Sequence, residues 1–123
     1  MIVRIDERWL LEIQERYVPE ESRLRDFTAL KAVVARQLAD GPHVGYTIDA
    51  AWIAAAVGHT IVKLRPMESR NGLFAACAVF SCMAAAGSAI DPKYGDLNGL
   101  VRDVDNGAAD VFEMAGRIRS WIV

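Results

Sequence analysis

The chain has 123 residues, which is the length of one domain with a single hydrophobic core. Its apolar fraction of 53% contains many alanines and few alternating β-branched runs, a composition typical of packed helices. The net charge of −2 disfavours a nucleic-acid-binding protein, because such proteins usually present a basic surface. We therefore predict an all-α protein: a compact bundle of five to seven helices forming a single domain over residues 1–123.

The sequence also bears on where the protein works. Acidic residues interrupt the first ten positions, so these lack the layout of a signal peptide. The apolar run at 73–86 covers about 14 residues, which is too short to span a bilayer. Cys77 and Cys82 would lie roughly 140° apart on a helix, a spacing that suits neither a disulfide bridge nor a zinc site. We expect buried free thiols, a cytoplasmic protein, and no membrane or nucleic-acid partner.

Two helices are predicted in the first third of the chain. Asp6 has the side chain of a helix N-cap, and apolar residues follow it at helical spacing over 7–17. Pro19 ends this helix. Asp26 is a second N-cap, and the helix that it begins covers 27–40, before the Gly-Pro pair that stops it.

The third predicted helix is rich in alanine and begins at Thr47 or Asp49. Its small side chains allow other helices to approach closely. Gly58 is expected to break the helix, which places His59 at its end. The following segment, "TIVKLRPMES" at 60–69, contains a proline and is expected to be irregular.

Three more helices complete the prediction. Ser69 or Asn71 is expected to cap an apolar helix over 72–86, which ends at the next glycine. A short helix follows over 97–104. Asp110 then begins the last helix, whose apolar residues recur at helical spacing.

The segment after His59 has the chemistry of an anion site. It offers the cations Lys63, Arg65 and Arg70, and it leads into the start of a long helix. The first turn of a helix has free N–H donors and a partial positive charge, which together with cations suit phosphate oxygens. His59 would then be a general base near that anion, and Glu68 would hold a magnesium ion or pair with an arginine.

A structural interpretation of the same residues stays open. On chemistry alone the charged segment is more typical of a solvated surface, and His59 would then only cap the carbonyl groups of the preceding helix. The other histidine, His43, lies in a loop, where we expect a role in packing or at the surface.

Three stretches of the chain share features with a known family. "YTIDAAWIAAAVGHTI" is similar to the Ala-rich helix that leads into the signature H-x-F-x-D/E-x-N-K-R of the Fic and death-on-curing (Doc) family. "NGLFAACAVFSCMAAAG" is similar to the buried helix after that signature, and "DVDNGAADVFEMAGRIRSWI" to the tail of the small Doc type. The element order and length resemble that type from end to end, which implies a Fic/Doc-like helical domain.

The signature itself departs from the family pattern after its histidine. His59 matches the family histidine, and Lys63 falls where the family has a metal-binding acid. With about three residues inserted, Glu68 comes near that acid and Arg70 near the basic pair. The resemblance implies ATP or another nucleotide with Mg²⁺ as cofactor, His59 as base and Glu68 as metal ligand. It implies phosphate contacts from Lys63, Arg65, Arg70, Asn71 and Gly72.

These observations leave three functions open. The first is a diverged Fic/Doc-type transferase that moves a phosphoryl or nucleotidyl group to a hydroxyl with His59 as base. The second is a catalytically inactive binding module. It would engage an antitoxin-like protein, as in a toxin–antitoxin pair, or bind other copies of itself to form a homo-oligomer. The third is an enzyme of different chemistry that acts on a small anionic substrate at the basic segment.

Overall fold

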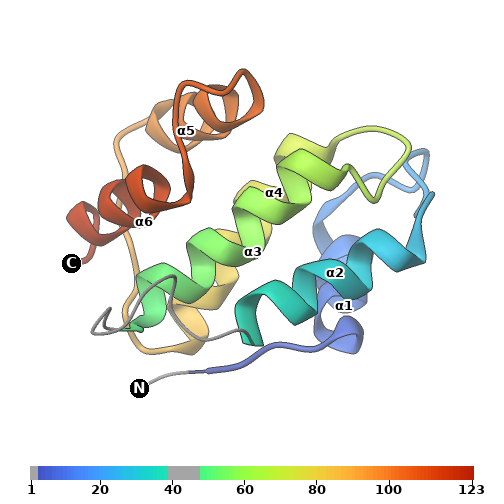
Figure 1. Cartoon of the computed structure of the whole chain (residues 1–123), viewed down its shortest axis with the longest axis horizontal. Coiled ribbons are helices and arrows are strands. Elements are labelled where there is room, and N and C mark those ends of the chain that lie inside the picture. The colour runs from blue at the N-terminus through green and yellow to red at the C-terminus, as the bar shows by residue number, and fades with distance from the viewer. Residues whose placement is uncertain (1–2, 39–47) are drawn as a thin grey trace.

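The computed structural model describes residues 3–38 and 48–123. Within these ranges the chain forms six helices and no strands, which confirms the all-α prediction (Figure 1). None of these helices combines the length and the apolar character that crossing a membrane requires. His43 lies outside the described residues. The helices are α1 (Glu7–Tyr17), α2 (Phe27–Leu38), α3 (Ala50–Leu64), α4 (Asn71–Ala85), α5 (Asp96–Asp105) and α6 (Val111–Ser120).

Aspartate side chains begin four of the six helices. Asp6, Asp26, Asp49 and Asp110 each accept a hydrogen bond from the backbone N–H three residues further on, at 2.8–3.1 Å. Each such cap typically contributes ~1 kcal/mol to stability, because it satisfies an N–H group that has no partner within the helix. The starts predicted at Asp6, Asp26 and Asp110 are confirmed, and of the two alternatives for the third helix Asp49 is the cap.

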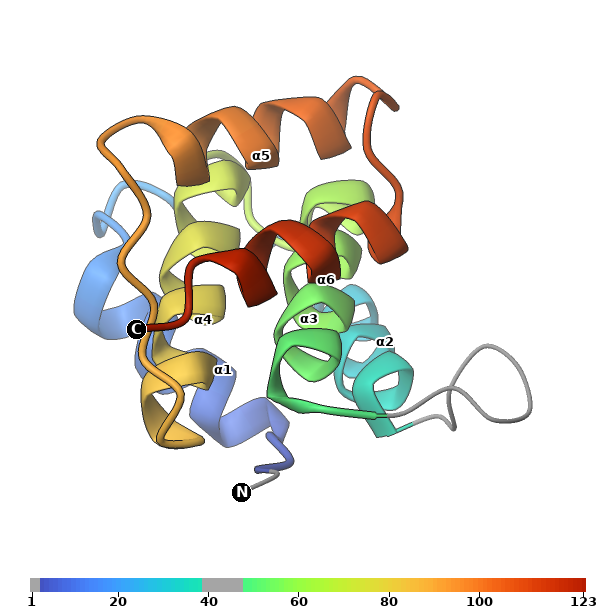
Figure 2. The same ribbon diagram turned by 90° about the vertical axis from the view of Figure 1, so that its left-hand side faces the viewer.

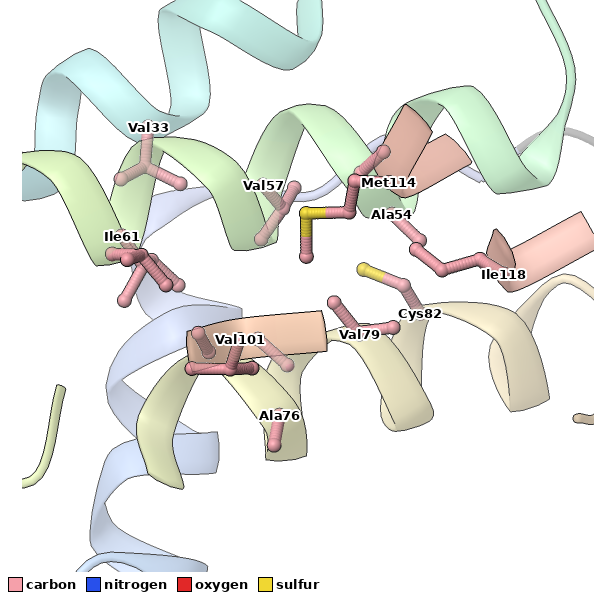
Figure 3. Close-up of a cluster of buried hydrophobic side chains, with 14 of the residues drawn as sticks. Val33, Ala54, Val57, Ile61, Ala76, Val79, Cys82, Val101, Met114 and Ile118 are labelled. Atoms are coloured by element: carbon pink, nitrogen blue, oxygen red, sulfur yellow. The ribbon is translucent and has the colours of Figure 1, made fainter. Parts of the chain in front are cut away.

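Helix α3 is the central element and packs against α2, α4, α5 and α6. Figure 2 shows α3 and α4 side by side, with α5 and α6 crossing them. The α3 residues from Ala51 to Gly58 are all buried, and half of them are alanines. Met114 of α6 lies between α3 and α4 together with Val79 of α4 (Figure 3). Small side chains on α3 therefore let three helices share one apolar core.

The predicted end of α3 at Gly58 is wrong. A Cβ atom on Gly58 would lie 2.6 Å from Val79 Cγ2 and 2.7 Å from Met114 Cε, so the glycine permits close helix packing in mid-helix. The segment predicted to be irregular is helical as far as Leu64, with Ile61 and Val62 buried. The helix ends only where the proline approaches, and His59 consequently lies within α3 rather than at its end.

The predicted cap of α4 is also wrong. The N-cap position is Arg70, in the left-handed region at φ 62°, and it makes no side-chain capping bond. Asn71 instead donates to the Met67 carbonyl at 3.0 Å and accepts from the Met67 N–H at 2.9 Å. The Ser22 hydroxyl bonds the Ser69 carbonyl. These contacts hold the loop before α4 in place. The prediction that α4 ends at Gly87 is confirmed, since Gly87 has φ 76°.

Candidate functional site

A pocket of about 420 Å³ lies where the end of α3, the start of α4 and one face of α5 meet. Its lining carries four arginines and two acids, a net formal charge of +2. The arginines come from three separate parts of the chain, so tertiary packing gathers them. The lining residues are Arg25, Val62, Arg65, Glu68, Ser69, Arg70, Asn71, Gly72, Asn98, Val101, Arg102 and Asp105.

Arg65 occupies the end of α3 with a left-handed backbone at φ 50°. Its Nη2 atom lies 2.7 Å from Asp105 Oδ1 on α5, forming an ion pair. Arg25 Nη2 donates to the Arg65 carbonyl oxygen at 2.6 Å. The side chains of the ion pair are 58% and 49% exposed, so solvent screens their attraction and a competing anion can exchange with Asp105.

The start of α4 presents backbone donors to the pocket. The first backbone bond to the N-cap carbonyl runs from Phe74 N–H to Arg70, so the three preceding N–H groups lie in the uncapped first turn. Asn71 and Gly72 both line the pocket. Because the side-chain amide of Asn71 is hydrogen-bonded to the Met67 backbone, Asn71 would contact a ligand through its backbone N–H. The helix dipole places partial positive charge at the same point.

One face of α5 forms the opposite wall of the pocket. Asn98, Val101, Arg102 and Asp105 follow the three-and-four spacing of a helix face, and all four line the cavity. A Cβ atom on Gly72 would lie 3.2 Å from Val101 Cγ1, so this glycine allows α4 and α5 to approach. The helical spacing on α5 was visible in the sequence, but nothing local indicated that this face would meet the start of α4.

The structure brings together most of the predicted site residues. Arg65, Glu68, Arg70, Asn71 and Gly72 all line one pocket. Sequence reasoning missed the two arginines contributed from elsewhere, Arg25 before α2 and Arg102 on α5, because each lies far from the basic segment along the chain.

His59 and Lys63 are not among the residues that line this pocket. The pKa of His59 is lowered, first by burial and then by the charges of Lys63 and Arg36, while Asp110 opposes this shift. These groups belong to α2, α3 and the start of α6. The imidazole is thus set among charges other than those that line the pocket, although burial does favour its neutral form.

Glu68 lies at the pocket with an exposed side chain, and its backbone N–H donates to the Arg23 carbonyl at 2.8 Å. Among the described residues, no group of three His, Cys, Asp or Glu side chains is placed to hold a metal ion. The magnesium role of Glu68 therefore stays a prediction from the family resemblance, in which nucleotide phosphates and water supply further ligands.

Comparison of the chain with protein-family models, curated proteins and solved structures found no match. The resemblance to the Fic/Doc family stays a prediction that rests on the stretches quoted above.

Proposed function

We propose that the protein binds a small anionic ligand, with a phosphate ester or nucleotide as the first choice, in the pocket at the start of α4. The observation that carries this proposal is the convergence of four arginines and an uncapped helix N-terminus on one cavity of about 420 Å³. Arginine and backbone N–H groups both donate to phosphate oxygens, and the helix dipole adds to the attraction.

The charge and size of the pocket support a phosphate ester. A phosphate monoester carries about −1.5 to −2 charges at neutral pH, which balances the net charge of +2 on the lining. Sites for small molecules usually have volumes of about 300–1,000 Å³, and this cavity falls within that range. Val62 and Val101 provide an apolar surface for the uncharged part of the ligand.

Ligand binding has more support than transfer chemistry with His59 as base. A general base must come within hydrogen-bond reach of the proton that it removes, directly or through one water. His59 is absent from the pocket lining, whereas four of the five predicted phosphate contacts, Arg65, Arg70, Asn71 and Gly72, are present. The diverged Fic/Doc-type transferase is therefore the less supported function of the two.

Calorimetric titration with inorganic phosphate and with ATP, each with and without Mg²⁺, tests the binding proposal. We expect Arg70→Gln and Arg102→Gln each to weaken binding about 10-fold or more, since hydrogen bonds to charged groups are typically worth ~1.5–3 kcal/mol. The matched control is Arg8→Gln, because Arg8 is 89% exposed on α1 and away from the pocket. Binding of neither probe, or an equal loss in all three variants, would contradict the proposal.

Incubation with labelled ATP and Mg²⁺ separates binding from transfer. If the pocket only binds its ligand, the wild-type protein and His59→Ala will titrate alike and neither will label a protein target. Labelling that disappears in His59→Ala would instead establish the transferase, with His59 as base.

A further inference from the structure

Helix α4 differs from the other five helices in that none of its residues is charged. Its inner face is buried in the core through Phe74, Val79 and Met83. Its opposite face carries the outer stripe, defined here as Leu73, Cys77, Phe80 and Ala84. These four residues follow a spacing of four, three and four, which aligns them along one side of a helix.

The outer stripe is apolar and accessible. Leu73 is 37% exposed and Phe80 is 46% exposed, and Cys77 is partly exposed between them. Beside the stripe, Tyr17 of α1 and Ser81 join Cys77 and Phe80 around a groove of about 250 Å³. No charged residue lines this groove. A contiguous apolar surface of this kind is typical of a contact surface.

The ends of α4 indicate what covers the stripe. The helix has no acidic residue in its first turn and no basic residue in its last turn, so nothing within it offsets its dipole. Arg70 adds a full positive charge at the positive end. A second copy of α4 in antiparallel orientation would place each positive end beside the negative end of the other. A strongly charged partner would find no charged group on the stripe with which to pair.

We propose that the outer stripe of α4 packs antiparallel against the same stripe of a second copy, forming a symmetric dimer. A two-fold axis midway along the stripe passes between Cys77 and Phe80, so Phe80 of one copy lies opposite Cys77 of the other. The two Cys77 residues are then offset by roughly 4.5 Å along the helices. With helix axes ~8–10 Å apart, both thiols come within reach of a short cross-linker.

Size-exclusion chromatography with light scattering tests the dimer over a dilution series from about 100 μM, because a small interface made by one helix pair should dissociate on dilution. We expect the wild-type chain to elute as a dimer at high concentration. Phe80→Glu should weaken dimerisation at least 10-fold because it buries a charge. Phe27→Glu on α2 is the matched control, since Phe27 is 45% exposed, and it should leave the dimer intact. A monomeric wild-type chain, or equal dissociation by both variants, would overturn the proposal.

Cross-linking of Cys77 gives a second test that does not depend on the folding of Phe80→Glu. Burial raises the pKa of the Cys82 thiol to about 12, so Cys82 is poorly reactive, and Cys82→Ala leaves Cys77 as the single thiol. A short bis-maleimide should link two chains of this variant through Cys77, and Cys77→Ala should abolish the product. Failure to form the linked dimer in Cys82→Ala, or an equal yield in the Cys77→Ala chain, would overturn the antiparallel arrangement.

Discussion

Two regions of the α3–α4 pair, its middle and its loop end, show opposite kinds of packing. In the middle, Gly58 leaves room for Val79 and Met114, and the helices close over an apolar core (Figure 3). At the loop end, Arg65 and Arg70 both adopt left-handed backbone conformations, and a polar pocket opens between the helices and α5. The same two helices therefore supply stability at one point and a binding surface at another.

The largest expected effect tests the closed middle. Gly58→Val should lower the free energy of unfolding by about 3 kcal/mol, because its side chain would overlap Val79 and Met114 in a filled core. Gly116 on α6 is exposed with open space around it, so Gly116→Val should change stability by less than about 0.5 kcal/mol. Urea denaturation followed by circular dichroism measures both. Equal effects at the two glycines would show that close packing at Gly58 contributes nothing.

The next effect tests how the pocket loop is held. Asn71→Ala should cost about 2 kcal/mol, because it removes both hydrogen bonds to the backbone of buried Met67. It should also weaken phosphate binding, since the loop positions the α4 N-terminus. Asn98→Ala is the control in the same pocket, because the Asn98 side chain is exposed and makes no hydrogen bond to the residues in the ranges 3–38 and 48–123. Thermal and urea unfolding of the two variants should differ clearly.

A smaller effect separates stability from binding at the loop end. Arg70→Gly should raise the free energy of unfolding by about 1 kcal/mol, because glycine adopts φ 62° without the strain that a Cβ atom brings. The same substitution should weaken phosphate binding by removing one of four arginines. Unfolding curves and calorimetric titration of one preparation test whether stability rises while phosphate binding weakens. A variant that loses stability would indicate that the Arg70 side chain holds the loop in place.

The smallest effect concerns pH. The folded-state pKa of His59 lies below its ordinary value of 6.5, because burial and nearby cations disfavour the charged imidazole. The unfolded chain then binds more protons than the folded chain as pH falls through 6.5, so the folded state loses stability over that interval and regains it on return to neutral pH. His59→Gln should flatten this pH dependence in unfolding measurements made from pH 8 down to values below 6.5. An unchanged pH profile would contradict the lowered pKa.

Local interactions explain what was predictable from the amino-acid sequence. The four aspartate caps each bond to a backbone N–H three residues away, and Gly87 and Gly107 adopt positive φ beside helix ends. Such features depend on neighbouring residues, so the all-α class and most helix starts followed from patterning. The predicted anion-binding segment also formed part of a real pocket, since its residues are close along the chain.

Contacts between distant segments decided the rest. Gly58 has the local signature of a helix end, and only the approach of Val79 and Met114 makes it a packing position inside α3. With α3 extended in this way, His59 does not line the pocket, whereas Arg25 and Arg102 from other parts of the chain do. The aspartate caps are governed by hydrogen bonds within a few residues, whereas the end of α3 and the pocket are governed by how whole helices pack. The sequence therefore determined the helical class and most helix starts, and the packing of the helices determined the site.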